Sequence, residues 1–414
     1  MARIVLKFGG TSVADTDKIQ NAAKKVAREV ELGHEVAVIV SAMSGVTNRL
    51  VAYCNAISDT HDKREYDAVV SSGEQITAGL MAVALQELGI EARSWMGWQL
   101  PILCSESHGK ARIEDIAPEK MLESMGTKKV AVLAGFQGVT KNGRIATLGR
   151  GGSDTTAVAL AAALKADRCD IYTDVDGVYT TDPRITKKAR KIDKISYEEM
   201  LEMASLGAKV LQTRSVEMAY KHDMPLQVLS SFDEAIGSEM PGTLVTREED
   251  IMEKQVVNGV TYAKNEAKIT LFDVPDTPGI AAEVFGPLTN CDVNVDMIVQ
   301  NVSQDGKVTD MTFTAPEEDL ERAIKCLESN ENLKGTDIVT NKDIVKISVV
   351  GIGMVSHAGV ALTMFKTLAE KGINIHIIST SEIKISVIID KEYLELAVRA
   401  LHTAYGLDAD SKSA

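Results

Sequence analysis

Short apolar runs alternate with stretches of helical spacing from residue 1 to about residue 245. Residues 4–6 form the first apolar run, which is typical of a buried strand, and residues 15–31 follow it with the periodicity of an amphipathic helix. Residues 35–41 repeat the strand pattern, and the alanine-rich stretch 157–166 repeats the helical one. This alternation predicts an α/β domain over residues 1–245, with a mostly parallel sheet covered by helices on both faces.

Polar and small residues follow the predicted strands at the points where the strands end. Lys7, Gly9 and Gly10 follow the first strand, and residues 41–47 follow the second. Ligands of open α/β sheets bind at the carboxyl ends of the strands, so these loops are expected to share one crevice. A glycine turn at a helix N-terminus, beside a lysine, offers backbone N–H groups and positive charge to a phosphate. The alternative is an ordinary tight turn with a solvated lysine.

The sequence GRGGSD at 149–154 is the strongest single candidate for binding chemistry. It places the guanidinium of Arg150 four residues before the carboxylate of Asp154, around two glycines that allow close approach of the backbone. Such a pair can hold a carboxylate and an ammonium group together. The alternatives are structural: Ser153 or Asp154 could cap the alanine-rich helix, and Glu74 could be a first-turn carboxylate.

The pattern changes beyond residue 245. Residues 246–262 are a predicted linker with a charged segment, and a repeat with an offset of 80 residues follows. The repeated positions are Gly279, Phe285, Asn294 and Ile298, which recur as Gly359, Phe365, Asn374 and Ile378. Two copies are too few for a solenoid, so we predict two small α+β domains over 263–342 and 343–408.

Composition excludes several classes of partner and site. The net charge of -14 argues against binding to nucleic acid or to an anionic membrane. The five cysteines are scattered and form no CxxC pair, which favours a reducing cytosol over a disulfide framework or a zinc site. The sequence begins with a predicted strand and contains no run of 18 apolar residues. We therefore expect a cytoplasmic protein without a bound structural metal.

Six motifs in fixed order resemble those of the aspartate kinases, the members of the amino-acid kinase family that carry two ACT domains. The motifs are KFGGTS at 7–12, SAMSGVT at 41–47, SGE at 72–74, GRGGSDTTA at 149–157, TDVDGVY at 173–179 and GAKVL at 207–211. The repeated half resembles the ferredoxin-like ACT pair, with ISTSEIKIS at 378–386 close to the second copy. The resemblance covers essentially the whole chain. It departs from the family at Gln212 and Thr213, where relatives have histidine and proline.

The resemblance implies ATP-dependent phosphorylation of the β-carboxylate of L-aspartate to 4-phospho-L-aspartate, the first step towards lysine, threonine and methionine. A carboxylate is already nucleophilic at neutral pH, so no general base is needed, and the task is electrostatic. Because the sequence offers no carboxylate cage, Mg²⁺ is expected to bind mainly to the ATP phosphates. The rival interpretations are a kinase for glutamate, acetylglutamate or a nucleotide, and a non-catalytic amino-acid-binding regulator.

The family match assigns roles to individual residues. Lys7, Lys209 and Asp154 would be catalytic. The nucleotide would contact Lys7, Phe8, Gly9, Gly10, Thr173, Asp174, Tyr179, Arg184, Lys209 and Val210. Aspartate would contact Ser41, Thr47, Glu74, Arg150, Gly151, Gly152, Ser153 and Asp154, with Arg150 on the α-carboxylate and Glu74 and Asp154 on the α-ammonium.

The ACT pair implies an effector amino acid bound between copies from two subunits, and hence a homodimer or larger homo-oligomer. Threonine and lysine, as end products, are the expected inhibitors. By match, the first copy would contribute Asp276, Gly279, Ile280, Ala281, Asn294 and Gln300. The second would contribute Val360, Ala361, Asn374 and Ile375. The alternative is that these are turn and strand-end residues only.

Overall fold

The computed structural model describes residues 1–126, 129–207, 210–251, 255–302, 307–357 and 359–408. The chain forms two compact units. The first contains residues 1–179, 191–205 and the described residues from 210 to 251. The second contains residues 180–190, 206–207 and the described residues from 255 onward.

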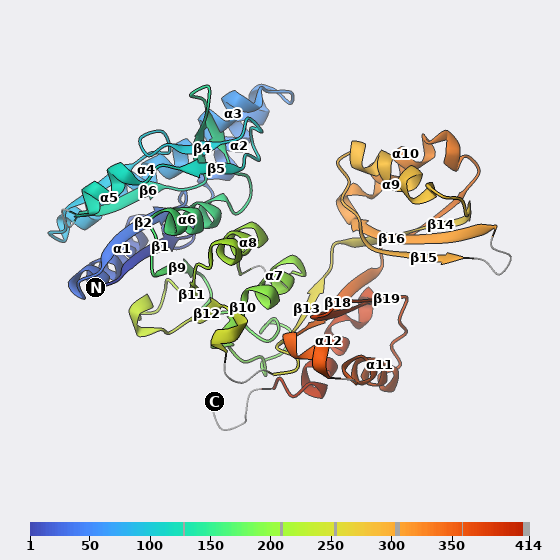
Figure 1. Cartoon of the computed structure of the whole chain (residues 1–414). Coiled ribbons are helices and arrows are strands. Elements are labelled where there is room, and N and C mark those ends of the chain that lie inside the picture. Colours follow the sequence, from blue (N-terminus) through green and yellow to red (C-terminus); the bar gives the residue numbers. More distant parts are fainter. Residues whose placement is uncertain (127–128, 208–209, 252–254, 303–306, 358, 409–414) are drawn as a thin grey trace. The chain divides into compact units, whose positions relative to one another are not determined.

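An eight-stranded sheet organises the first unit (Figure 1). The strand order is β10-β12-β11-β9-β1-β2-β6-β3, and every neighbouring pair is parallel except β11 and β12. The strands are β1 (Arg3–Phe8), β2 (Glu35–Val40), β3 (Ala92–Trp95), β6 (Val130–Ala134), β9 (Arg168–Thr173), β10 (Lys194–Ser196), β11 (Leu226–Ser230) and β12 (Thr243–Thr246). This confirms the predicted mostly parallel α/β sheet.

Helices cover both faces of this sheet. Ile4, Leu6 and Phe8 of β1 pack in one core with residues of α1 (Thr16–Glu31) and α4 (Ser72–Glu87). The intervening β1 residues face the other way, where α6 (Gly152–Ala163) packs on β1, β2 and β9. Other helices of this unit are α5 (Glu119–Gly126), α7 (Tyr197–Ser205) and α8 (Thr213–His222). The period-2 alternation of β1 therefore assigns each of its side chains to one helical layer.

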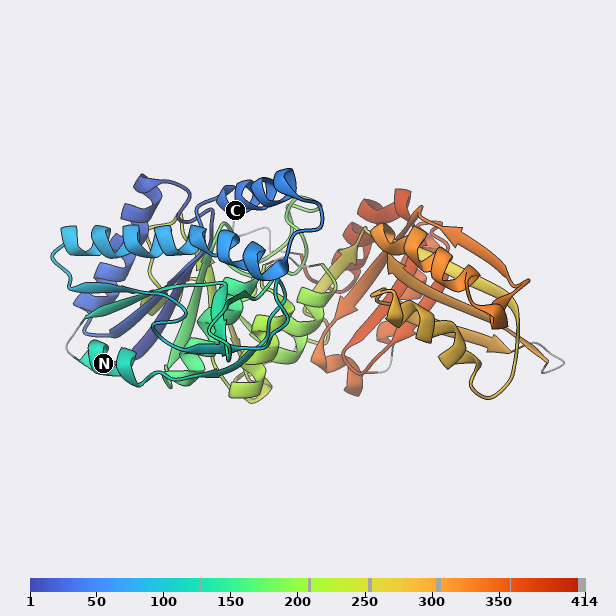
Figure 2. The ribbon, with the colours of Figure 1, turned by 90° about the horizontal axis from the view of Figure 1, so that it is seen from above.

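A smaller four-stranded sheet completes the first unit (Figure 2). Its order is β5 (Ile113–Ile116), β4 (Ile102–Cys104), β7 (Gln137–Thr140) and β8 (Ile145–Thr147). Helix α3 (Lys63–Val70) packs on β8 and is preceded by α2 (Val46–Ile57). The helical stretch Lys63–Glu87 has the length and hydropathy of a membrane span, but half of its apolar window is buried and α4 packs on the sheet. It is therefore a core helix of this unit.

The second unit contains the two repeats, each a four-stranded antiparallel sheet with two helices (Figure 1). The first repeat has strand order β15-β16-β14-β17 and helices α9 and α10. Its elements are β14 (Glu266–Pro275), α9 (Ile280–Asn290), β15 (Asp296–Val302), β16 (Val308–Pro316), α10 (Leu320–Glu328) and β17 (Asp337–Asn341). These elements make the first repeat an α+β domain, as predicted.

The second repeat differs from the prediction in its first strand. Its sheet order is β13-β18-β20-β19, with β13 (Gly259–Ala263) antiparallel to β18 (Ile344–Val350). Its other elements are α11 (Val360–Glu370), β19 (Ile377–Thr380), β20 (Lys384–Asp390) and α12 (Leu394–Ala404). Most of β13 lies within the predicted linker 246–262, and that part of the prediction is wrong. The first repeat is thus inserted between β13 and β18.

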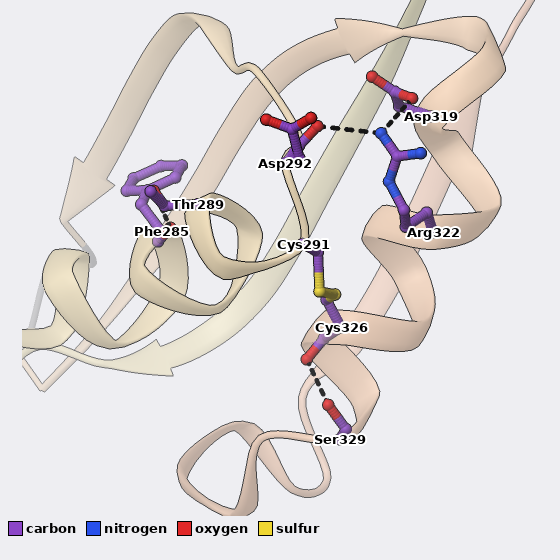
Figure 3. Close-up of a disulfide and its surroundings, with 8 residues drawn as sticks. All are labelled: Phe285, Thr289, Cys291, Asp292, Asp319, Arg322, Cys326 and Ser329. Carbon is purple, nitrogen blue, oxygen red and sulfur yellow. Dashed lines mark hydrogen bonds and ion pairs between the residues drawn. A yellow bond between two sulfur atoms is a disulfide. The ribbon is translucent and has the colours of Figure 1, made fainter. Parts of the chain in front are cut away.

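Two of the five cysteines are paired, contrary to the expectation from their scattered positions. Cys291 and Cys326 form a disulfide that joins the end of α9 to α10 (Figure 3). The two helices pack against each other on one face of the first repeat's sheet, which brings together cysteines 35 residues apart. Cys54, Cys104 and Cys169 are free and buried. Sequence spacing alone carries no sign of such a pairing, because it depends on helix packing.

Candidate active site

Lys7 is the central cation of the site, and its position follows from the alternation of β1. Phe8 points into the α1 and α4 layer, where it stacks on Tyr172 with ring centroids 4.7 Å apart. Lys7 lies on the opposite face, is only 7% exposed, and forms an ion pair with Asp154 in the first turn of α6. Burying a lysine charge to this extent is costly unless the ammonium is paired with an acid or binds a ligand.

A cavity of about 340 Å³ opens beside this ion pair. It is lined by the end of β1, the loop after β2, and the first turns of α2, α4 and α6. All eight residues that the family match assigns to aspartate lie on its wall: Ser41, Thr47, Glu74, Arg150, Gly151, Gly152, Ser153 and Asp154. Lys7 and Gly10 line it as well. Loops from distant parts of the sequence therefore meet at one place, as the strand-end argument predicts.

Helix N-termini give the cavity much of its positive character. Helix α2 begins after Gly45 and α6 after Gly151; both glycines are left-handed, with φ of +79° and +72°, and neither helix has a side-chain cap. The structural alternative, in which the side chain of Ser153 or Asp154 caps α6, is therefore wrong. By contrast, the side chain of Asp15 caps α1 by accepting from the backbone of Lys18. Helices α2 and α6 thus present backbone N–H groups without a side-chain cap to the cavity, where an anion could bind.

Close packing explains why glycines stand at two cavity positions. A Cβ at Gly152 would lie 2.8 Å from the ring of Phe136, and one at Gly10 would lie 3.0 Å from the carbonyl oxygen of Ala42. Phe136 itself has a positive φ of 68° and lines the cavity. The sequence motifs do not include Phe136. Its position just after β6 places it at a strand end, where ligand-binding residues of such sheets are expected.

Glu74 is the acidic residue of the site whose charge is least compensated. It is 3% exposed, and one of its carboxylate oxygens has no hydrogen-bond partner. Burial raises its pKa to about 7, although hydrogen bonds from the backbone of Ala42 and of Glu74 itself oppose the shift. A positively charged ligand would stabilise the ionised form of such a buried carboxyl group.

The nucleotide loop predicted at residues 173–179 begins at the adjacent strand end. The backbone N–H of Gly9 donates to the carbonyl oxygen of Tyr172, which precedes Thr173. Ser231 donates its hydroxyl hydrogen to the carbonyl oxygen of Thr173, and its Oγ accepts from the hydroxyl of Ser12, at 2.9 and 2.8 Å. These two serines join the ends of β1, β9 and β11. Ser12 lies within the KFGGTS motif but was assigned no role from the sequence, and Ser231 was not singled out.

The other nucleotide residues have varied surroundings. Asp174 is exposed, and Tyr179 donates from its hydroxyl to Asp176 at 3.0 Å. Gly10 borders the cavity, Val210 is half-buried just before α8, and Lys209 lies outside the described residues. Arg184 belongs to the second unit, where it forms an ion pair with Asp182. The ring of Phe8 is in the core, so only its backbone is available to a ligand.

The residues assigned to effector binding occupy matching places in the two repeats. Gly279 and Gly359 precede α9 and α11 with φ of +101° and +107°. Ile280, Ala281, Val360 and Ala361 form the first turns of these helices, and Asn294, Asn374 and Ile375 lie just before β15 and β19. Asp276 follows β14, and Gln300 lies within β15. The positive φ explains why glycine recurs at this position.

Family models match the chain in three segments. The model described as the amino acid kinase family matches residues 2–230, and ACT domain models match residues 268–332 and 347–405. The first of these covers more than half of the chain.

Known proteins match it over its whole length. An aspartate kinase of Pseudomonas putida is 53% identical, covering 100% of this chain and 99% of that protein, and an aspartokinase of Corynebacterium glutamicum is 44% identical over 100% and 98%. E. coli aspartokinase III in complex with aspartate and ADP superimposes with a TM-score of 0.81 at 28% identity, over 97% and 99% of the two chains. The chain belongs to the amino acid kinase family, and within it to the aspartate kinases with two ACT domains.

Proposed function

We propose that the protein transfers the γ-phosphoryl group of ATP to the β-carboxylate of L-aspartate, giving 4-phospho-L-aspartate and ADP. The observation that supports this most strongly is the cavity wall. It combines two uncapped helix N-termini and the cations Lys7 and Arg150 with the buried acids Glu74 and Asp154. This set of charges suits a small zwitterion with an additional carboxylate.

Each part of aspartate has a complementary group on the wall. Arg150 binds the α-carboxylate through its planar guanidinium, and Glu74 binds the α-ammonium, which stabilises its ionised form. Asp154 contributes to the ammonium site and also orients Lys7 through their ion pair. Ser41 and Thr47 position the β-carboxylate near the N-terminus of α2.

The transfer step depends on electrostatic stabilisation rather than on proton transfer. The β-carboxylate attacks the γ-phosphorus, the bond to the β,γ-bridging oxygen breaks, and ADP leaves with that oxygen. Lys7 and Lys209 stabilise the charge that spreads over the phosphoryl oxygens.

We also propose that Mg²⁺ accompanies ATP and neutralises phosphate charge when bound. No group of three or more His, Cys, Asp or Glu side chains able to hold a metal occurs in the part of the chain that the structure describes. In this proposal Asp154 pairs with Lys7, and Glu74 and Asp154 bind the ammonium group of the substrate. Phosphate oxygens are therefore the main ligands in this proposal.

A hydroxylamine trap tests the proposal directly, because an acyl phosphate reacts with hydroxylamine to give a coloured hydroxamate. The purified chain is incubated with ATP, Mg²⁺, hydroxylamine and one acid at a time. We expect hydroxamate and ADP with L-aspartate only, and neither product with L-glutamate or N-acetyl-L-glutamate. Preference for either of the latter acids would reassign the substrate, and absence of turnover with all three would favour a non-catalytic regulator.

For the second unit, we propose feedback inhibition by threonine, lysine or both, bound between ACT domains of a homodimer or larger homo-oligomer. E. coli aspartokinase III, whose complex with lysine and aspartate superimposes with a TM-score of 0.75, supports lysine as a candidate. Initial rates with each amino acid alone and with both distinguish the possibilities, and light scattering gives the oligomeric mass. Unchanged rates in all three cases would leave the ACT domains without this role.

A further inference from the structure

A buried carboxylate outside the cavity connects α3 to the loop that carries Arg150. Asp67 is completely buried on α3. Its oxygens receive the backbone N–H of Gly109 at 3.1 Å and the hydroxyl of Thr147, and His108 Nδ1 lies 2.7 Å from Oδ2. Three groups from two separate segments, 108–109 and β8, thus converge on one carboxylate.

The partners of Asp67 lie directly beneath the glycine loop. Thr147 is the last residue of β8, two residues before Gly149 and three before Arg150. The backbones of Gly109 and Gly149 lie close together: a Cβ added at Gly149 would be 3.2 Å from the carbonyl oxygen of Gly109. Gly149 has a φ of +76°, so the turn that sends Arg150 into the cavity rests on the segment that Asp67 holds.

The opposite side of this loop is fixed independently. Arg214 of α8 donates to the carbonyl oxygens of Leu148 at 2.6 Å and Ala111 at 3.1 Å. Ala111 in turn donates its N–H to the carbonyl oxygen of Thr147 at 2.9 Å. The base of the loop is therefore held by backbone and side-chain bonds, and Asp67 is the anionic centre of this support.

A carboxylate is a costly residue to bury for stability alone. Removing it from water is unfavourable unless its hydrogen bonds are well formed, and an apolar side chain of similar size would pack α3 on β8 without that cost. Networks of this kind fix the geometry of neighbouring groups, as the outer shell of a binding site does.

We propose that Asp67 is a positioning residue for aspartate binding, acting through Thr147, Gly109 and the Gly149 turn on the side chain of Arg150. This inference rests on the proposed function, in which Arg150 binds the α-carboxylate. Arg150 makes the same contact before and during transfer, so misplacing it weakens aspartate binding more than it slows the chemical step.

The test is Asp67→Asn, which keeps the size of the side chain but replaces one acceptor oxygen by a donor that faces other donors. We expect the KM for aspartate to rise about tenfold, with kcat and the KM for ATP changed less than twofold. Asp62→Asn is the matched control, because Asp62 caps the same helix, is exposed, and its side chain bonds only to Arg64 among the residues that the structure describes. It should leave all three constants unchanged.

A double mutant shows whether Asp67 acts through Arg150. Arg150→Ala alone raises the KM for aspartate; adding Asp67→Asn should raise it no further. Multiplication of the two effects would overturn the inference, as would parallel losses in kcat and in both KM values. If Asp67→Asn does not fold, Thr147→Val and Thr147→Ser decide: valine should raise the KM for aspartate and serine should restore it, and equal values would refute the proposal.

Failure of the inference is distinguishable from failure of the proposed function. The wild-type hydroxamate assay decides whether aspartate is phosphorylated at all, without any variant. An active wild type whose Asp67→Asn variant keeps its KM for aspartate would contradict only the positioning role.

Discussion

Glu74→Gln is expected to make the free enzyme more stable above neutral pH while weakening its affinity for aspartate. The wild-type carboxyl group is 3% exposed, and one of its oxygens has no partner. Glutamine removes the buried charge and keeps an oxygen that can accept from the backbone. In the proposed mechanism it also removes the partner of the substrate's ammonium group, so the KM for aspartate should rise.

The magnitude follows from the pKa of Glu74, which burial raises from an ordinary value of 4.5 to about 7. The folded protein holds a proton between these values that the unfolded chain releases, so the free energy of unfolding falls as the pH rises through this window. Above pH 7, the full pKa shift corresponds to a loss of about 3 kcal/mol in the free energy of unfolding. Glutamine does not titrate, and the variant should gain up to this amount, or roughly 6–12 °C in Tm.

Tryptophan fluorescence provides a suitable assay, because both tryptophans, Trp95 and Trp98, lie in the first unit with Glu74. Melting curves of the two proteins are compared from pH 4 to pH 9, without substrate. The Tm difference should be small near pH 4.5 and largest above pH 7. Glu87→Gln, on the exposed end of the same helix, is the control and should show no such trend. A Tm difference independent of pH would refute the reasoning.

The other predictions concern the two cations of the site and the disulfide. Lys7→Ala should lower kcat, as measured by ADP release, by about 10² to 10³ with the fold kept; near-normal turnover would remove Lys7 from the mechanism. Arg150→Ala should raise the KM for aspartate with kcat nearly kept, and an unchanged KM would contradict its role. Cys326→Ser should lower the stability of the second unit by up to about 4 kcal/mol, since the disulfide closes a 35-residue segment. A reductant should then destabilise the wild type, as followed by circular dichroism, but not the variant.

Local patterns were sufficient to predict the sheet and the meeting of its loops. Apolar runs of strand length, each followed by small and polar residues, identify strand ends, and parallel strands bring their ends to one edge. The same period-2 rule separates Lys7 from Phe8, because neighbouring strand residues point to opposite faces. Applied residue by residue, it would have placed the Phe8 ring in the core from the sequence.

The capping of α6 could not be predicted with the same success. Serine, aspartate and glycine all occur at helix N-caps, and GRGGSD offers each of them within four positions. Tertiary contacts decide which residue stands at the N-cap. Asp154 forms an ion pair with Lys7 of β1, and Gly151 adopts the left-handed conformation that precedes the helix. Neither contact has a signature in the local sequence.

Long-range pairing accounts for the remaining differences. The fourth strand of the first repeat, β17, follows its last helix, whereas the equivalent strand of the second repeat, β13, precedes the whole first repeat. A repeat detected by its 80-residue offset cannot reveal this, because the two fourth strands stand on opposite sides of their own repeats. The Cys291–Cys326 disulfide is missed for a similar reason.

Ion pairs connect the two ACT domains, through a buried lysine of the second repeat. Lys346 of β18 is 4% exposed, and its ammonium forms ion pairs with Glu266 at 3.5 Å and Asp296 at 2.5 Å, both from the first repeat. Replacing these carboxylates would leave the buried ammonium of Lys346 without its partners, so the second repeat is expected to lose stability.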